Sequence, residues 1–439
     1  MAFSLPGVHV PHRKHTQNKP VLKMDPPQTV AIPMSMHIGT PATPIVKVGD
    51  LVKVGQKIAE ASGYISSPIH ASVSGKVTKI ADFLTSDGRT VLSVMIESDG
   101  EMAVDESVVP PTVTNREDLV AAIKESGVVG LGGAGFPTYV KFDVDPERID
   151  WLVINGAECE PYVTSDTVTM TTRADDMAVA LRSLAQHLGI KQAVIGIESN
   201  KKQAITVMKQ LAAEVAGDIA LTVKVLPAKY PQGGEKVLVY HTIGREIPVG
   251  KLPIDVGCIV INCTTLAAIG TYLATGMPLV EKCVTVDGGC VANSQNVLAP
   301  IGASMADLFA VCGGLTAEAE KLIYGGPMMG ITVPADSAPV MKNTNAILAL
   351  TGKEAWLPKT TACIRCGACT NICPFGLAPA AISSALSKRD ADELDKLAVN
   401  ACMECGCCSF VCPANRPLVQ NNKLGKAFLR EAKAKEGVK

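Results

Sequence analysis

The stretch CIRCGACTNICP, from Cys363 to Pro374, is repeated in pattern by CMECGCCSFVCP, from Cys402 to Pro413. Both runs have the spacing C-x2-C-x2-C-x3-C-P, with which cysteine thiolates enclose cubanes of iron and sulfide. In compact folds that carry two such runs, the fourth cysteine of each run binds the other cluster. The sequence therefore predicts two [4Fe–4S] clusters with two ligand sets: Cys363, Cys366, Cys369 and Cys412 for one, and Cys402, Cys405, Cys408 and Cys373 for the other.

Zinc is the alternative occupant of these runs, because C-x2-C pairs also form zinc sites. Two complete runs of four cysteines are hard to explain by zinc, so iron–sulfur clusters are the favoured interpretation. The other seven of the 15 cysteines show no pairing framework, which indicates free thiols in a reducing cytosol. They are Cys159, Cys258, Cys263, Cys283, Cys290, Cys312 and Cys407, and we expect Cys407, which lies outside the spacing, to bind no iron.

Composition excludes several classes of function. The chain has 439 residues, enough for about three domains, and a net charge of -1 that gives no reason to expect nucleic acid as a partner. Its N-terminus lacks the apolar segment of a secretion signal. Residues 256–280 contain no charged residue, but they include several polar residues, Gly276 and Pro278. We therefore predict a buried strand over 258–262 and a short buried helix instead of a membrane span.

The N-terminal quarter of the chain has the pattern of a β-structure. Residues 1–40 are rich in proline and histidine and are expected to form an extended strap. Residues 42–100 consist of short β-branched segments with glycine and proline at the corners, including two similar strand-and-turn units at 46–50 and 52–56. This segment resembles a biotinyl/lipoyl-type β-sandwich. Such carriers present a modifiable lysine on a hairpin, but Tyr64 lies near that position here, so a structural or docking module is expected.

The middle of the chain alternates between strand and helix patterns. We predict strands over 151–155, 192–197 and 221–226, with helices over 115–125, 175–188 and 201–215, which indicates an α/β sheet. Short strands return over 283–286 and 291–297, with a helix over 304–311, and a helical linker over 378–398 separates the two cysteine runs. The predicted domains are residues 1–108, 109–275, 276–350 and 351–439.

A glycine-dense loop, GLGGAGFPT over 130–138, is the second candidate site. Glycine lets the backbone approach a phosphate closely, and a following helix N-terminus favours anions. The loop follows a helix and has the spacing G-x-G-G-x-G-F, so it is not a dinucleotide fingerprint. Taken alone it could equally be a tight turn. Beside an electron-transfer module, a flavin or nucleotide site is the better interpretation.

The loop and three later segments resemble the NADH-oxidising, flavin-binding subunit of respiratory complex I. The matching residues are the 130–138 loop with Lys141, the segment NGAECEP over 155–161, Gly233-Gly234-Glu235, and Asn262 with Thr265. Three positions depart from that family's pattern, namely Ala157 in place of an acidic residue, Ile261 in place of an asparagine and Thr264 in place of a glutamate. These departures put individual flavin hydrogen bonds in doubt more than the loop itself.

The N-terminal sandwich together with the two-cluster tail is similar to the RnfC family of the Rnf electron-transport complexes, which are membrane-bound ferredoxin:NAD oxidoreductases. The resemblance covers essentially the whole chain. It implies an α/β multidomain fold with a lipoyl-like β-sandwich, an α/β domain that binds FMN and NAD(H), a β-grasp domain and an α-helical two-cluster ferredoxin domain. It also implies a peripheral position on the cytoplasmic side of the cell membrane, without a transmembrane segment, and partners among the other Rnf subunits, including a ferredoxin-like iron–sulfur subunit.

The resemblance also implies roles for particular residues. Non-covalent FMN would receive a hydride from NAD(H) and pass single electrons to the clusters, in a complex that moves Na+ or H+, and no catalytic side chain is expected. Gly130 and Gly132 would hold the phosphate, with Lys141 offsetting its charge. Other residues would hold the flavin (Asn155, Glu158, Asn262 and Thr265) or contact NAD(H) (Gly133, Ala134, Phe136, Glu160 and Glu235), with Lys251 at the mouth of the pocket.

Two other functions stay open at this point. The chain could be the flavin subunit of a soluble hydrogenase or formate dehydrogenase assembly, although such relatives usually carry different cluster motifs around the same core. It could also be a non-enzymatic relay of clusters on an inert scaffold. Flavin binding separates the relay from the two enzymes, and co-purification with integral membrane subunits separates the enzymes from one another.

Overall fold

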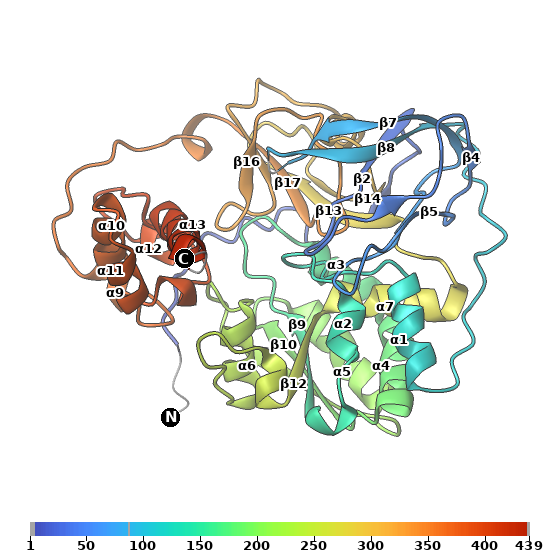
Figure 1. Ribbon diagram of the computed structural model, residues 1–439, viewed down its shortest axis with the longest axis horizontal. Coiled ribbons are helices and arrows are strands. Elements are labelled where there is room, and N and C mark those ends of the chain that lie inside the picture. Colours follow the sequence, from blue (N-terminus) through green and yellow to red (C-terminus); the bar gives the residue numbers. More distant parts are fainter. Residues whose placement is uncertain (1–4, 87, 437–439) are drawn as a thin grey trace.

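The central sheet of the α/β domain consists of four parallel strands in the order β11-β10-β9-β12. The computed structural model describes residues 5–86 and 88–436, and Figure 1 shows this domain as its lower half. The strands are β9 (Trp151–Gly156), β10 (Gln192–Glu198), β11 (Ala220–Leu226) and β12 (Cys258–Asn262). All four lie where apolar runs in the sequence indicate a strand, including the segment 258–262 that precedes the uncharged helix.

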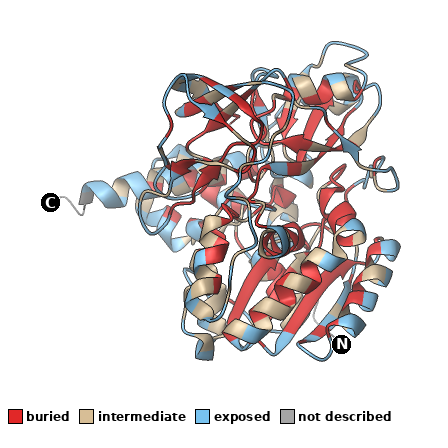
Figure 2. Cartoon of the chain, turned by 90° about the vertical axis from the view of Figure 1, so that its right-hand side faces the viewer, coloured by how far each residue is buried: buried red, intermediate tan, exposed pale blue. Residues whose placement is uncertain are grey.

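Helices cover both faces of this sheet, as a parallel sheet requires. Leu152 and Ile154 pack on one face with helices of the larger core, whereas Val153 packs on the other with Leu238 of α6. Figure 2 shows the buried strands between helices whose outer faces are exposed. The helices of this domain are α1 (Arg116–Glu125), α2 (Thr138–Phe142), α3 (Ser165–Thr172), α4 (Ala174–Leu188), α5 (Lys202–Glu214), α6 (Glu235–Ile243) and α7 (Cys263–Thr275).

The N-terminal domain is a β-sandwich of two small sheets, in the orders β2-β8-β7-β4 and β3-β5-β6. Its strands are β2 (Thr29–Pro33), β3 (Thr43–Pro44), β4 (Leu51–Val52), β5 (Lys57–Glu60), β6 (Ile69–His70), β7 (Gly75–Leu84) and β8 (Thr90–Ser98). The two similar units at 46–56 are turns more than strands. In each, the backbone N–H of a lysine donates to a side chain three residues on, from Lys47 to Asp50 and from Lys53 to Gln56.

The N-terminal strap, predicted over residues 1–40, is interrupted by a turn at residues 15–18 and by bends at 37–40. Residues 29–33 form β2 of the sandwich, and β1 (Leu22–Lys23) adds in parallel to β14 (Gln295–Pro300) of the β-grasp domain. Nearer the N-terminus, Val8 forms a bridge with Tyr230 of the α/β domain, with N–H to O distances of 2.7 and 2.9 Å. The strap thereby connects three domains that are distant in the sequence.

The β-grasp domain contains a six-stranded mixed sheet, β1-β14-β13-β17-β15-β16, and helix α8 (Met305–Val311). The strand predicted over 291–297 was placed too early. Turns occupy the residues after Gly288, and the strand begins only at Gln295. The remaining strands are β13 (Glu281–Asp287), β14 (Gln295–Pro300), β15 (Lys321–Tyr324), β16 (Ile331–Val333) and β17 (Ala346–Leu350).

The two cysteine runs lie in a helical lobe at the left of Figure 1, joined to the β-grasp domain by a long connection. Its helices are α9 (Ala368–Asn371), α10 (Pro379–Ser387), α11 (Ala391–Lys396), α12 (Cys407–Phe410) and α13 (Leu418–Glu436). Short 3-10 helices occur at Pro146–Arg148, Pro253–Val256, Gly352–Glu354 and Val399–Ala401. In residues 5–86 and 88–436, no helix is both long and apolar enough to cross a membrane.

Candidate functional site

A cleft with an empty volume of about 1350 Å³ opens at the carboxyl ends of β9 and β12. We call it the central cleft. Ligands of open α/β sheets bind at this end of the strands. The structure brings eleven of the twelve predicted cofactor-binding residues to its lining: Gly130, Gly132, Gly133, Ala134, Phe136, Lys141, Asn155, Glu158, Glu160, Glu235 and Asn262.

The twelfth residue, Thr265, lies behind the glycine loop and fixes it. Its hydroxyl oxygen accepts the Leu131 N–H at 3.0 Å, and Asn343 of the β-grasp domain donates to the Gly133 carbonyl at 3.0 Å. Within the described residues, the exposed N–H groups of Gly132 to Ala134 have no protein acceptor. A row of free amides on a fixed loop is a binding site for an anionic or carbonyl oxygen.

Two asparagines at the ends of neighbouring strands shape the floor of the cleft. The Asn155 side chain donates from Nδ2 to the Gly233 carbonyl at 2.9 Å, and its Oδ1 accepts the Ala157 N–H at 3.1 Å. Asn262 caps α7 and donates from Nδ2 to Asp166 at 2.8 Å. Asp166 also lines the cleft but was not predicted, because an isolated Asp on a helix has no signal in the sequence.

The carboxylate of Glu158 is already occupied by protein donors. It accepts the Asp166 N–H at 2.8 Å and the Thr167 hydroxyl at 2.7 Å, and it pairs with Lys201 at 3.2 Å. The Lys201 side chain is 0% exposed, so removing either partner would leave a buried charge. Glu158 therefore stabilises the wall of the cleft through its bonds to Asp166, Thr167 and Lys201.

Lys14 of the N-terminal strap is a second support that the sequence did not reveal. Its ammonium donates to the backbone carbonyls of Glu158 at 3.0 Å and Glu160 at 2.7 Å, and also to that of Val163. Burial lowers the pKa of Lys14 to about 8. The carbonyls of Glu158 and Glu160 belong to the segment 155–161 that resembles the flavin-binding motif, and Val163 follows it, so the strap holds that segment in place.

Glu160 and Lys141 are two ionisable side chains of the cleft, and burial shifts their pKa values in opposite directions. Glu160 accepts the N–H groups of Met328 at 3.0 Å and Met329 at 2.8 Å, and burial raises its pKa to about 7. Lys141 donates to the Val260 carbonyl at 2.8 Å, and burial lowers its pKa. Glu160 thus joins the α/β domain to a β-grasp loop. Lys141 is a cationic side chain in the cleft lining that follows the glycine loop closely in the sequence.

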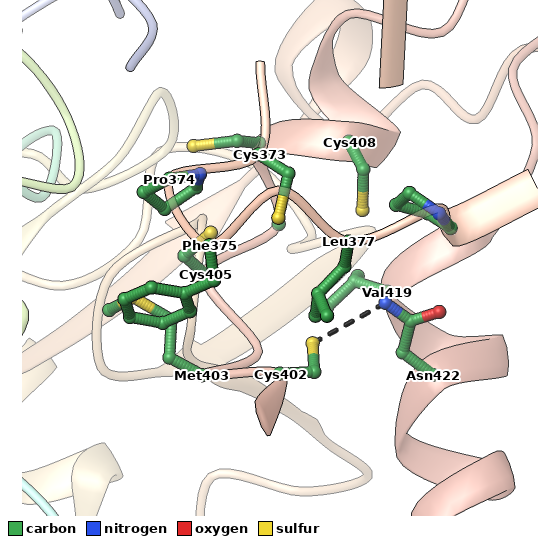
Figure 3. A pocket seen from close by; sticks show the side chains of 13 residues that line it. Cys373, Pro374, Phe375, Leu377, Cys402, Met403, Cys405, Cys408, Val419 and Asn422 are labelled. Carbon is green, nitrogen blue, oxygen red and sulfur yellow. Dashed lines mark hydrogen bonds between the residues drawn. The ribbon is translucent and has the colours of Figure 1, made fainter. Parts of the chain in front are cut away.

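The eight motif cysteines surround two separate cavities in the two sets of four that the spacing predicts. Cys373, Cys402, Cys405 and Cys408, together with Cys407, line one cavity, the inner site, shown in Figure 3. Cys363, Cys366, Cys369 and Cys412 line another of about 780 Å³, the outer site. Within the described part of the chain, no three His, Cys, Asp or Glu side chains converge as they would around a single metal ion. A cubane holds its four thiolates apart, on separate irons, and soft sulfur ligands suit iron–sulfur clusters.

Two hydrogen bonds reach a cysteine sulfur of the inner site. Asn422 donates to the Cys402 sulfur at 3.3 Å, drawn as a dashed line in Figure 3, and the Glu404 N–H donates to the same sulfur at 3.4 Å. Hydrogen bonds to cluster sulfurs are one of the terms that set the reduction potential. Cys407 also lines the inner site, and its sulfur lies 3.9 Å from the Tyr230 carbonyl oxygen, so its place outside the ligand set stays a prediction.

The inner site and the central cleft share a wall. Met403 lines both cavities, and the Tyr230 hydroxyl, at the cleft, donates to the Cys405 carbonyl at 2.6 Å. A Cβ added to Gly234 would lie 2.2 Å from the terminal methyl of Met403. The second cysteine run, residues 402–413, is therefore packed directly on the cleft. Whatever binds in the cleft is therefore adjacent to the inner cysteines.

Comparison with protein families divides the chain into four matched regions. Residues 3–101 match the RnfC barrel sandwich hybrid domain, and residues 123–271 match the Nuo51 FMN-binding domain. Residues 283–332 match the SLBB domain, and residues 359–420 match the 4Fe-4S dicluster domain.

Three curated relatives, each the C component of its complex, are similar over most of their length. The chain is 43% identical over 380 residues to that component of the Na(+)-translocating ferredoxin:NAD(+) oxidoreductase complex of Acetobacterium woodii, covering 85% of both chains. It is 39% identical over 388 residues to its proton-translocating counterpart in Clostridium ljungdahlii, covering 86% of this chain and 83% of that one. It is also 39% identical over 436 residues to its counterpart in the ion-translocating oxidoreductase complex of Rhodobacter capsulatus, covering 98% and 84%.

Among solved structures, the NAD+-reducing [NiFe]-hydrogenase has a similar fold. In its H2-reduced state the TM-score is 0.50 at 18% identity, covering 72% of this chain and 61% of that chain. In its air-oxidized state the TM-score is 0.51 at 17% identity, covering 70% of this chain and 63% of the hydrogenase chain. This chain thus spans less than two thirds of the hydrogenase chain, and the likeness shows the fold alone.

Proposed function

The chain belongs to the RnfC family of ion-translocating ferredoxin:NAD(+) oxidoreductase complexes, and from that premise we propose how its sites divide the work. It carries an FMN-binding domain and a 4Fe-4S dicluster domain. We propose that the central cleft binds FMN and NAD(H), and that the inner and outer sites hold the two clusters. Bound FMN would supply the exchange between a hydride and single electrons, which the clusters cannot make.

The wall shared by the central cleft and the inner site carries this proposal. Met403 lines both cavities, so a flavin in the cleft would be separated from the inner cluster by little more than one side chain. The outer site lies farther along the same lobe, and its Cys363 and Cys366 are exposed. Electrons would therefore pass along the series NAD(H), flavin, inner cluster, outer cluster and partner.

The free amides of Gly132 to Ala134 would bind the flavin phosphate or a ring oxygen, because they have no acceptor among the described residues. Helix α6 begins at Glu235 without a side-chain cap on Gly234, so its first N–H groups add a partial positive charge at the cleft. Lys141 would offset the negative charge of the phosphate. The hydrogen bonds of Asn155 and Asn262 hold the floor on which the isoalloxazine ring would lie.

The exposed outer site is suited to a protein partner that accepts single electrons. Ile364, between two of its cysteines, is 68% exposed. We propose that this face contacts an iron–sulfur subunit of the same complex, and that the chain is held at the cytoplasmic membrane surface through such partners.

A soluble hydrogenase role has less support. The resemblance to the [NiFe]-hydrogenase is confined to the fold at 18% identity, whereas the relatives from ion-translocating complexes are up to 43% identical, and the sandwich domain matches the RnfC model. The experiment that tests the assignment is anaerobic purification from membranes of the native organism. We expect FMN to remain bound and integral membrane subunits to co-purify. A chain that carries no flavin after reconstitution with FMN would contradict the proposal.

A further inference from the structure

A further cavity of the helical lobe adjoins the outer site, and we call it the basic groove. It shares Cys363, Arg365, Ala380 and Arg416 with the lining of the outer site. Its remaining polar residues come from α10 and α13, namely Ser383, Ser384, Ser387 and Asn421. A group bound in the groove would therefore lie beside cysteines of the outer site.

The two adjoining cavities are lined by positive charge without a carboxylate. Arg365 and Arg416 line both of them, and no described Asp or Glu is part of either lining. Arg416 donates to the Thr361 carbonyl at 3.5 Å, and Arg365, between Cys363 and Cys366, is exposed. Within residues 5–86 and 88–436, neither arginine forms an ion pair. Both guanidinium groups therefore keep their charge available for a bound group.

Further cations follow the groove in the sequence. The segment 355–389 contains four cationic residues and no Asp or Glu, and these four are Lys359, Arg365, Lys388 and Arg389. Lys388 and Arg389, which we call the rim, are exposed and come directly after Ser387 of the groove. Among the described residues, the rim forms no ion pair.

The first carboxylates that follow these cations along the chain have other partners. Asp390 accepts the Glu393 N–H at 2.9 Å and caps α11. Glu431 pairs with Lys435, which lowers the pKa of Glu431 more than Arg389 does. The face around the outer site and the basic groove therefore has a positive charge that the chain leaves largely uncompensated.

The inner site differs in this respect, because charges beside it are paired within the chain. Glu404, which precedes Cys405, pairs with Lys426 at 2.6 Å and lies 3.9 Å from Lys423. The outer site has no such carboxylate in its lining, and its Cys363 and Cys366 are exposed. A surface whose positive charge is not neutralised by its own chain attracts an anionic partner.

Neutralisation of the cluster itself is the competing role for the two arginines, because a cluster held by four thiolates is anionic. Arg365 and Arg416 are placed for that role, since they line the outer site. Lys388 and Arg389 line neither the outer site nor the basic groove, so their charge extends the positive surface past the cluster. Figure 1 shows α10, which ends just before this rim, at the side of the lobe away from the other domains.

We propose that the basic groove and its rim dock an acidic protein surface around the redox centre of a partner, with a carboxylate of that partner bound in the groove by Arg365 and Arg416. This inference rests on the proposed function and names the chemistry of the partner at the outer site. Each encounter moves one electron between the outer cluster and the partner's centre. Guanidinium groups bind carboxylates through paired, charge-assisted hydrogen bonds. Attraction between opposite charges mainly speeds association, which suits a partner that exchanges an electron and then separates.

The test measures how the full chain, loaded with FMN and clusters, binds to membranes that hold the other subunits of the complex but lack this chain. The bound fraction is determined by sedimentation at about 50 mM and about 500 mM NaCl, because salt screens charges at a surface. We expect the apparent affinity to fall about tenfold or more at the higher salt concentration. Protein-free vesicles of the same lipids should bind the chain far more weakly, since the proposed partner is a protein.

Charge reversal in the groove and at the rim tests the surface residue by residue. Arg365→Glu combined with Arg416→Glu should lower the affinity at low salt about tenfold or more, and added salt should then have little further effect. Lys388→Glu combined with Arg389→Glu leaves both cavity linings unchanged. This rim variant should weaken binding in the same direction while its iron content and the midpoint potential of its outer cluster stay at wild-type values.

The matched control reverses the same number of charges outside the lobe. Lys202 and Lys209 are exposed residues of α5, so Lys202→Glu combined with Lys209→Glu should bind like wild type. Arg365→Lys combined with Arg416→Lys keeps the charge of the groove and should keep most of the salt dependence. If the Arg365→Glu, Arg416→Glu variant loses iron, the rim variant alone decides.

Three results would overturn the inference: wild-type affinity in the rim variant, a loss of affinity that is as large at high salt as at low salt, or equal binding to protein-free vesicles. A shifted midpoint potential of the outer cluster with unchanged binding would also overturn it, because the arginines would then serve their own cluster. A wild-type chain that shows salt-dependent binding, but whose clusters NADH does not reduce, would instead refute the proposed function.

Discussion

Gly132 is a residue of the central cleft at which a side chain has no room. A Cβ there would lie 2.4 Å from Nδ2 of Asn262, and that nitrogen is fixed by its hydrogen bond to Asp166. Either the glycine loop or the floor of the cleft would have to move. The proposed phosphate site depends on both, because the loop supplies the amides and Asn262 caps the adjacent helix.

We therefore expect Gly132→Ala to lower FMN affinity by about tenfold or more, since a contact below 3.0 Å must displace a buried group. Flavin retained after gel filtration, and flavin fluorescence during titration, measure this directly. Gly217→Ala is the matched control, because a Cβ there meets nothing within 4 Å and the residue is remote from the cleft. Equal flavin affinity in both variants would show that the loop does not hold the cofactor.

The sequence predicted the residues that face the cleft better than the residues that support them. Eleven of the twelve candidates line the cavity, because a glycine loop and polar strand ends leave a local pattern. Lys14 and Lys201 were missed because buried lysines are rare and nothing local marks them. Lys14 meets carbonyls about 150 positions away, a contact that only the tertiary fold creates.

At the scale of elements, the two cysteine runs form similar units that are placed differently. Gly367 and Gly406 precede α9 and α12 with nearly equal φ values of 78° and 80°, and each short helix carries the third cysteine. The second run, 402–413, is nevertheless packed against Tyr230 and Met328, whereas the first run, 363–374, has exposed cysteines. On the proposed ligand sets, substitution of a fourth cysteine acts on the cluster of the other run.

Substituting the fourth cysteines tests both the ligand sets and the order of the clusters. Cys373→Ala should remove the inner cluster, so iron falls by about half and NADH no longer reduces the outer cluster. Cys412→Ala should remove the outer cluster, with a similar loss of iron, yet NADH should still reduce the inner one. Electron paramagnetic resonance after NADH or dithionite distinguishes these cases, because dithionite reduces either cluster without the flavin. Reduction of the outer cluster by NADH at the wild-type rate in Cys373→Ala would contradict the order.

Element positions followed from the sequence wherever burial dictated them. Strands β9, β10 and β12 are mostly buried apolar runs, and the predicted bounds of all four strands of the α/β sheet differ from the observed ones by at most one residue. The small β-domains were harder. The segment 46–50 has the composition of a strand but forms a turn closed by Asp50, and the strand predicted at 291 starts at Gln295. At 46–50 a side chain to backbone hydrogen bond favoured the turn over the strand.

At the scale of the whole molecule, Lys342 joins three domains through one buried ammonium group. It belongs to the β-grasp region and donates to the Ser67 hydroxyl at 3.1 Å and to the carbonyls of Pro68 at 2.6 Å and Gly127 at 2.7 Å. Burial lowers the pKa of Lys342 to about 7, without an acidic partner to restore it. The nearby His37 and His70 also have lowered pKa values, because they are buried and face the same cation.

Stability should therefore depend on pH through Lys342. Between pH about 7 and its ordinary pKa of 10.5, the folded chain holds this lysine largely neutral while the unfolded chain protonates it, so unfolding binds a proton and stability rises with pH. From pH 7 to 9 the contribution is at most about 2–3 kcal/mol. Lys342→Met should lose this rise in anaerobic urea unfolding, whereas Lys191→Met, at an exposed site, should keep it. Parallel pH profiles for wild type and Lys342→Met would contradict the buried, neutral state.

In the proposed function, one chain takes electrons from NADH through a flavin and delivers them to its own two clusters. Its most direct test is electron paramagnetic resonance of the anaerobic, cluster-loaded chain mixed with NADH, with and without added FMN. We predict that NADH reduces both clusters only in the FMN-loaded chain, while dithionite reduces them in either sample. Clusters that dithionite reduces but NADH leaves oxidised in the FMN-loaded chain would contradict the account.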